Sequence, residues 1–391
     1  METIRTFHPI GQGGFYTERF NDLPDKPMVV FDCGGKSKGF MEKYIDSFLP
    51  KDKKVTIEAV FISHLHDDHI NGLQHLLDKA TVKKIFLPQF NSNQLFDIIF
   101  YNAARGGKNS NQLVLSLIRS THSSLGGVSI IQVAEAIGDN INQNVYRTIQ
   151  DGISQTIASG TPMELENGWV YIPFNPKSST PNFNNIGDQS IKQKLEDLYK
   201  ETNICKQAEA LAEFVQSQSV KLCKTLYRKM FGGIHNGQSM TLFSGLRNHD
   251  SNIEICSHPF TPTCHRSQCP HWCDWFAKLA EHNKDCIPTN FLYTGDYEAG
   301  DSAKMKELSS FYTKIEVWKT ICGLQIPHHG SRNNYAKELY NKRCYAIASA
   351  GVDNKFHHPN IDTLINIFNK GCKPFVVTED KSTIIMQKFK F

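Results

Sequence analysis

The stretch FISHLHDDHING, residues 61–72, constrains the fold of this chain more than any other. It places His64, His66, Asp68 and His69 directly after the apolar run IEAVFI. A buried strand ending in a tight turn would bring these side chains into one pocket, and the His-x-His spacing points two imidazoles to the same side of an extended segment. Imidazole and carboxylate together suit zinc or another borderline divalent cation. The alternative, a solvated loop with chance histidines, leaves the preceding buried strand unexplained.

The length and composition of the chain limit the classes of protein to which it can belong. The 391 residues are 40% apolar and 21% charged, as in globular proteins, and fit one large α/β domain with insertions or two average domains. No run approaches the ~18 apolar residues of a membrane span, and METIRTFHPIGQGG lacks the apolar core of a signal peptide. We therefore expect a cytoplasmic protein without a membrane partner. Its 11 cysteines are then expected to be reduced thiols or metal ligands.

The first 90 residues alternate between strand and helix patterns. Residues 3–35 predict two or three strands around the turn GQGG, and the last of them, MVVFDCGG, is a buried strand ending at Asp32. A helix is expected over 37–49, before the strand that carries the histidines. A helix over 71–80 and a strand over 82–90 follow it. This order is what a layered α/β sheet requires.

The middle of the chain has a different character. Residues 91–159 are polar and helix-like, and a strand hairpin turning at Asn167-Gly168 is expected near 161–175. Two helices should follow, the second amphipathic with an apolar face running from Ala208 to Leu226. That face predicts core packing, and an interface for a partner helix is the alternative.

The motifs resemble a known family. HLHDDH matches the H-x-H-x-D-H signature of the metallo-β-lactamase fold superfamily. GQGG with Asp32, the segment around Asn236 and Ser239, HHGS at 328–331, and the segment from Ser349 to His358 resemble one branch. That branch is the metallo-hydrolase domain of bacterial competence DNA-uptake channels, with its free-standing relatives. The resemblance covers about 1–90 and 232–391, and Gly14 departs from an acidic residue frequent in the branch.

The resemblance implies an α/β fold, a four-layer αββα sandwich with its metal site along one edge. Residues 1–90 would form its first half and 232–391 its second half, with a Cys/His-rich insertion at 250–288. Residues 91–231 would be a largely helical elaboration, serving as a lid or as a docking surface for a protein partner.

The resemblance also implies a dinuclear site with two Zn²⁺ or, alternatively, Mn²⁺. A carboxylate between two cations offsets their mutual repulsion, and Asp296 at the end of NFLYTGD would have this role. One of His328 and His329 should bind metal, with His329 favoured, while the other faces the substrate. His235 could restore a third histidine that the branch lacks. The expected ligands are His64, His66, Asp68, His69, Asp296, His329 and His235, supported by Asp32, Asn236 and Ser331.

A second cluster of metal-binding residue types lies between 256 and 273. It contains Cys256, Cys264, Cys269 and Cys273 together with three histidines. A third, structural Zn²⁺ held here would stabilise an insertion too short for a core of its own. The alternative is a set of reduced cysteines, because the spacing fits no standard zinc-finger template.

The favoured function is a metal-dependent hydrolase of phosphodiester bonds, a nuclease or phosphodiesterase, that uses a metal-activated hydroxide. Asp68, His328 and His358 are the expected catalytic residues, for proton transfer and charge stabilisation. The substrate would be a nucleic acid or nucleotide, which the net charge of +4 permits, and the protein could act in a multi-protein antiviral defence system. The alternatives are β-lactam or thioester hydrolysis, and a regulatory module with a vestigial site.

Overall fold

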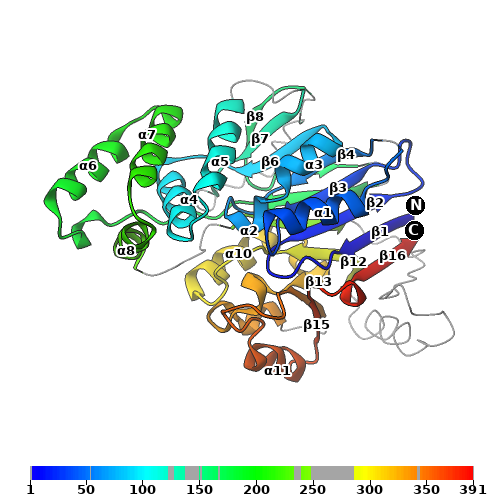
Figure 1. Ribbon diagram of the computed structural model, residues 1–391. Helices are drawn as coiled ribbons and strands as arrows, with labels where there is room; N and C mark the ends of the chain where they lie inside the picture. Colours follow the sequence, from blue (N-terminus) through cyan, green and yellow to red (C-terminus); the bar gives the residue numbers. More distant parts are fainter. Residues whose placement is uncertain are drawn as a thin grey trace.

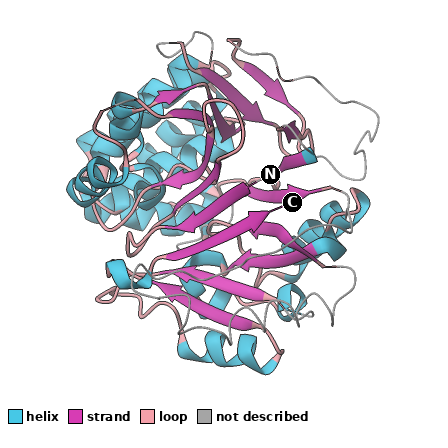
Figure 2. Cartoon of the chain, turned by 90° about the vertical axis from the view of Figure 1, so that its right-hand side faces the viewer, coloured by secondary structure: helices cyan, strands magenta, loops and turns pink. Residues whose placement is uncertain are grey.

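Two β-sheets pack face to face, with helices on both outer faces, in the computed structural model of the protein (Figures 1 and 2). The structure describes residues 2–52, 54–121 (108 and 109 without side chains), 127–136, 149, 152–165, 168–232, 239–247, 286–340 and 344–390. The expected four-layer αββα fold is confirmed. Within these ranges no helix has the length and apolar character needed to cross a membrane.

The first sheet has the strand order β16-β1-β2-β3-β4-β6-β7-β8, with β5 paired to β4. Strands β16, β1, β2 and β3 pair antiparallel, and the pairs from β3 to β8 are parallel. The strands are β1 Glu2–Phe7, β2 Phe15–Phe20, β3 Met28–Cys33, β4 Thr56–Phe61, β5 Thr81–Val82, β6 Lys84–Pro88, β7 Ser129–Val133, β8 Gln155–Ile157 and β16 Ile385–Lys390.

The second sheet has the order β15-β14-β13-β12-β11-β10-β9, antiparallel from β9 to β12 and parallel from β12 to β15. Its strands are β9 Met163–Glu164, β10 Trp169–Phe174, β11 Thr241–Leu246, β12 Ile287–Tyr293, β13 Ile321–Gln325, β14 Tyr345–Ser349 and β15 Lys373–Val377. Because β12, β13 and β14 are parallel, the loops after them emerge at one edge of the sheet.

The helices cover the outer faces of the sheets (Figure 1). Those on the side of the first sheet are α1 Lys38–Phe48, α2 Asp67–Ile70, α3 Leu73–Lys79, α4 Ser92–Ala104 and α5 Lys108–Ser120. Helices α6 Gln189–Lys200, α7 Ile204–Ser217 and α8 Val220–Phe231 form a further group, in which α7 and α8 pack on α4 and α6 packs on α7. Helices α10 Ser302–Lys314 and α11 Ile361–Asn369 cover the second. Short 3₁₀ turns are η2 Phe183–Asn185, η3 Trp318–Thr320, η4 Pro327–Gly330, η5 Arg332–Asn334, η6 Lys337–Tyr340 and η7 Lys381–Thr383.

Three hydrophobic clusters fill the spaces between the four layers. Strand β3 shows how one sequence serves two of them, because side chains alternate between the faces of a strand. Val30 packs towards the helices, whereas Val29 and Phe31 pack between the two sheets. An apolar run of this kind is typical of a strand buried on both faces.

The middle of the chain differs from the sequence expectation in two ways. The expected hairpin near 161–175 is present as the antiparallel pair β9 and β10 of the second sheet, but strands β7 and β8, which were not expected, extend the first sheet. The short runs SIIQV and QTI were too brief to stand out in a polar segment. The single amphipathic helix expected over 208–226 is two helices, because the Ser219 side chain accepts a hydrogen bond from the Leu222 backbone and begins α8.

A buried ion pair joins the two sheets. Arg5 on β1 donates from Nε to Glu18 Oε1 on β2 at 2.6 Å, and both side chains are almost fully buried. From the facing sheet, Tyr171 (2.6 Å) and Tyr293 (2.9 Å) donate to the Glu18 carboxylate. Arg5 also donates to the carbonyl oxygen of Thr289 on β12 at 2.8 Å. Both charges are therefore compensated by groups that fix how one sheet lies on the other.

We predict that Glu18→Gln lowers the free energy of unfolding by about 3–5 kcal/mol, because it leaves the Arg5 guanidinium buried without its counter-charge. Urea unfolding measures the change. Glu42→Gln is the matched control, since Glu42 pairs with Lys38 at 3.9 Å on the exposed surface and should cost below about 1 kcal/mol. Equal effects of the two variants would show that the buried pair does not hold the sheets together.

Candidate metal centre

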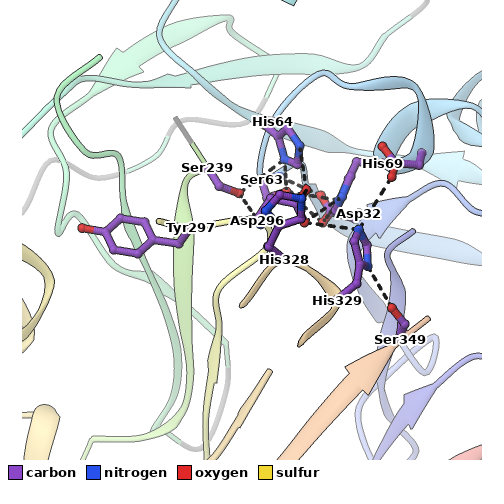
Figure 3. Close-up of polar contacts among 12 residues, drawn as sticks. Asp32, Ser63, His64, His69, Ser239, Asp296, Tyr297, His328, His329 and Ser349 are labelled. Carbon is purple, nitrogen blue, oxygen red and sulfur yellow. Dashed lines mark hydrogen bonds and ion pairs between the residues drawn. The ribbon is translucent and has the colours of Figure 1, made fainter. Parts of the chain in front are cut away.

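Loops from the two sheets meet where β4, β12 and β13 end, and their histidines surround Asp296 (Figure 3). His64 and His69 come from the loop and short helix α2 that follow β4. Asp296 follows β12, and His328 and His329 lie in η4 after β13. Segments more than 200 residues apart in the chain thus converge on one side chain.

The Asp296 carboxylate faces two sets of imidazoles with its two oxygens. Its Oδ1 lies 3.3 Å from Nε2 of His69 and 3.3 Å from Nε2 of His329. Its Oδ2 lies 3.9 Å from Nε2 of His64 and 3.7 Å from Nε2 of His328. A carboxylate presented in this way can serve two cations at once.

Two groups of donor atoms could each hold a metal ion. One consists of His64, His69 and Asp296, and the other of Asp68, His69 and His329, with the donor atoms of each group within 4.8 Å of one another. In the second group Nε2 of His329 lies 3.6 Å from Asp68 Oδ2. His66 stands beside His64, with ring centroids 4.4 Å apart, but is in neither group.

Hydrogen bonds behind the histidines orient their rings. His69 Nδ1 lies 2.8 Å from the buried Asp32 carboxylate, which also accepts from the Ser63 backbone N–H at 2.7 Å. Ser63 Oγ lies 2.9 Å from His64 Nδ1 and donates to Asp32. His329 Nδ1 donates to the Ser349 carbonyl at 2.8 Å. Each partner bonds Nδ1 and turns Nε2 towards Asp296. Burial acts to lower the pKa of His69 and His329, but the carboxylates that face the two rings raise it above the usual value.

The donor set fits a cation. Nε2 of His64, His69 and His329 is buried and has no hydrogen-bond partner, an arrangement that costs free energy unless another group binds there. Burial holds the pKa of His64 and His66 well below the usual value, so both rings are neutral, as ligands must be. Burial acts to raise the pKa of Asp296, but His328 and His329 hold it well below its usual value.

Three residues of the site have a strained backbone conformation. Asp32, His328 and His329 have φ values of 56°, 49° and 56°, a left-handed conformation that non-glycine residues rarely adopt. Gly14 lies behind the site, and a Cβ there would stand 2.8 Å from Asp32 Oδ2. A larger side chain at position 14 would therefore require Asp32 to move.

The other predicted residues lie around this centre or outside it. The His358 ring packs edge-on against His328, with centroids 5.7 Å apart. The Ser331 backbone N–H donates to His328 O, but the structure gives its hydroxyl no hydrogen bond to the described site residues. His235, Asn236 and the cysteines Cys256, Cys264, Cys269 and Cys273 fall outside the described residues.

Several contacting residues escaped the sequence analysis. Ser63 precedes the first histidine and links Asp32 to His64, a role that only the geometry reveals. Ser239, by contrast, belongs to the motif already noted in the sequence, and its hydroxyl accepts from the Asp296 backbone N–H at 3.0 Å. The Tyr101 ring stacks on His66, with centroids 3.5 Å apart and an interplanar angle of 8°. No local pattern marks Tyr101, which comes from the last turn of helix α4.

A small cavity lies beside His64 and His66, and Gln94 and Asp97 of helix α4 line it. The Gln94 side chain is 1% exposed, and neither of its polar atoms has a hydrogen-bond partner. Asp97 accepts a hydrogen bond from Tyr227 at 2.6 Å, and burial raises the pKa of Asp97 from 3.8 to about 7. Its carboxyl group therefore carries a proton below neutral pH.

We predict that Asp97 makes stability depend on pH. Since its folded-state pKa is raised, the folded chain binds the proton more tightly, and stability falls as the pH rises from about 4 to about 7 and then levels off. Asp97→Asn removes this fall, so its free energy of unfolding should exceed that of wild type by a few kcal/mol at pH 8 but not at pH 4. Urea unfolding across this range measures the difference, with the exposed Asp78→Asn as control. A difference independent of pH would contradict the prediction.

We predict that the purified protein binds two equivalents of Zn²⁺, and that Asp296→Asn loses at least one of them. Asp32→Asn should weaken binding about 10–100-fold, because His69 loses the group that orients it. Metal analysis after dialysis and competition with a chelator give these values. His75→Ala is the control, since His75 bonds Asp46 on the surface. If Asp296→Asn retains as many equivalents of Zn²⁺ as the wild type, the shared carboxylate is wrong.

Residues 24–86 match the family model described as the metallo-beta-lactamase superfamily. A stretch of 70 residues is 31% identical to ribonuclease J of Mycoplasma pneumoniae and covers 17% of this chain. The chain spans only 12% of that relative's length.

Two solved structures show a distant likeness. The metallo-beta-lactamase fold protein YhfI of Bacillus subtilis aligns over 98% of this chain and 99% of its own, with 9% identity and a TM-score of 0.35. A HARLDQ motif mutant of a metallo-beta-lactamase from Cronobacter sakazakii aligns over 42% of this chain and 49% of its own, with 13% identity and a TM-score of 0.21. The family-model match, which contains the whole histidine loop, and the ribonuclease J relative support the metallo-beta-lactamase superfamily for this chain.

Proposed function

We propose that this metallo-beta-lactamase-fold hydrolase is a dinuclear phosphodiesterase acting on nucleic acid or nucleotides. The observation that carries the proposal is the Asp296 carboxylate, with an imidazole pair at each oxygen. A relative named ribonuclease J and the HHGS motif of the competence branch favour phosphodiesters over other substrates.

The ligands would divide between the two oxygens of Asp296. His64, with His66 beside it, would bind one cation on the Oδ2 side, and Asp68, His69 and His329 would bind the other on the Oδ1 side. Two bound cations would supply an activated water and neutralise the charge on the phosphate oxygens. Zn²⁺ suits the imidazole-rich set, and Mn²⁺ also accepts imidazole with carboxylate.

The neighbouring histidines 328 and 329 would have different roles. The His329 side chain is 1% exposed and fixed by the Ser349 carbonyl, which suits a ligand. The His328 side chain is 20% exposed and packs against His358, which suits contact with the substrate. His328 and His358 would stabilise charge on the phosphate, and Asp68, with a side chain 25% exposed, would accept a proton.

Other hydrolase chemistry is the second candidate, because β-lactam or thioester cleavage can use the same donor set. A regulatory module with a vestigial site is the third, but a protein without catalysis has no need for four buried Nε2 or carboxylate donors round one point. We further propose that the protein acts in the cytoplasm and that helices α6 to α8, which extend from the sandwich in Figure 1, dock a partner protein of a defence system.

A substrate panel tests the proposal. Wild-type protein with Mn²⁺ or Zn²⁺ should hydrolyse bis-p-nitrophenyl phosphate and single-stranded DNA or RNA but not nitrocefin, and Asp296→Asn should lose about 100-fold or more of this activity. His329→Ala should lose metal, whereas His328→Ala should keep metal and lose kcat. Turnover of nitrocefin without any phosphodiester would establish the second candidate instead.

A further inference from the structure

A series of planar groups in mutual contact, called the arc here, runs beside the metal centre. Its members, in order, are His66, Tyr101, Arg105, Phe356, His358 and His328. The arc begins at helix α4, where Tyr101 stacks on His66, and Cζ of Arg105 lies 4.9 Å from the Tyr101 ring centroid. Cζ of Arg105 also lies 4.8 Å from the ring centroid of Phe356, which belongs to the loop between β14 and α11. Arg105 therefore joins the two sides of the site.

The second half of the arc returns to the metal centre. The Phe356 and His358 rings are 5.9 Å apart at an interplanar angle of 22°, and His358 packs against His328. Nε2 of His328 in turn lies 3.7 Å from Asp296 Oδ2. The guanidinium thus lies near the groups that surround Asp296.

Arg105 is an exposed cation without a carboxylate partner among the described residues. Arg332, which follows the HHGS motif, instead pairs with Asp362 at 3.7 Å. Aromatic rings occupy the faces of a stacked guanidinium but leave its N–H edges available. Those edges match the oxygens of a phosphate, which arginine binds with two hydrogen bonds.

Phe356 is 49% exposed, so packing in the protein interior does not account for an aromatic residue at this position. The loop that carries it is braced by Asn354, which accepts from the His358 backbone N–H at 2.8 Å and donates to the Gly351 carbonyl at 2.6 Å. An aromatic ring held in place with part of its surface open is the usual platform for an unstacked base.

We propose that Arg105 and Phe356 form a nucleotide subsite beside the metal centre. Arg105 binds a phosphate next to the scissile one, and the open surface of Phe356 stacks against a base, so the substrate is a single-stranded nucleic acid. The inference rests on the proposed phosphodiester hydrolysis and names its substrate class. If Arg105 only holds the loop against α4, substitutions of Arg105 and Phe356 will change neither the salt dependence of binding nor the preference for strands with bases.

Binding of a fluorescent single-stranded oligonucleotide with phosphorothioate linkages, which slow cleavage, tests the phosphate contact. Fluorescence anisotropy on the metal-loaded protein over a range of salt gives the slope of log Kd against log salt. Arg105→Ala should reduce the magnitude of the slope by about 0.7, the value for one phosphate contact on a single strand. Arg105→Lys should restore the slope. Arg119→Ala, which removes an exposed arginine of α5 paired with Glu209, is the control.

The base contact is tested by an abasic oligonucleotide of the same length. Wild-type protein should bind the base-containing strand about tenfold more tightly than the abasic strand. Phe356→Ala should lose this preference and keep the salt slope. Phe368→Ala is the matched control, because Phe368 is 65% exposed on α11 and lies outside the arc.

The outcomes separate the subsite from the function. If the wild type hydrolyses bis-p-nitrophenyl phosphate but Arg105→Ala keeps the wild-type slope, or Phe356→Ala keeps the base preference, the subsite is wrong and the function stands. If a blunt duplex binds more tightly than the single strand, the substrate class is wrong. If no phosphodiester is hydrolysed, the proposed function fails and the subsite with it.

Discussion

One carboxylate shared between two sets of imidazoles governs the organisation of this protein. Asp296 is 2% exposed, and nitrogen atoms of four histidines lie within 3.9 Å of its oxygens. Taking charged groups out of water costs several kcal/mol per ion unless strong partners compensate. Cations bound between the imidazoles and the carboxylate would provide that compensation. The surrounding protein is built to keep these groups in place.

The fold holds them through three kinds of contact. Parallel strands β12 and β13 deliver Asp296 and the 328–329 pair to one edge of their sheet, while β4 delivers the other histidines from the facing sheet. The Arg5–Glu18 pair, with the tyrosines around it, fixes how the sheets lie on each other. Asp32, in a left-handed conformation, then bonds His69 from behind. Backbone strain at Asp32 and His329 is offset by the groups that these side chains bind.

The sequence was informative where the chemistry is local. HLHDDH lies within six residues after an apolar strand, so its convergence could be predicted, and the αββα fold followed from the family resemblance. Tyr101 and Arg105 could not be predicted as site residues from the sequence. They lie at the end of α4, whose apolar pattern indicates only which side chains are buried, and the residues that they contact are distant in the chain. Strand β7 was missed because five residues in a polar segment do not show a period. The break between α7 and α8 is marked in the sequence only by Ser219, which caps α8. The apolar face continues across this break, so the pattern predicts one helix.

The central claim is that Asp296 joins two cations. Anomalous diffraction at the zinc edge from crystals of the metal-loaded protein measures this most directly. We expect two peaks roughly 3.5–4 Å apart, one on each oxygen of Asp296, with His64 at one peak and His69 and His329 at the other. A single peak, or two peaks of which only one touches Asp296, would contradict the account.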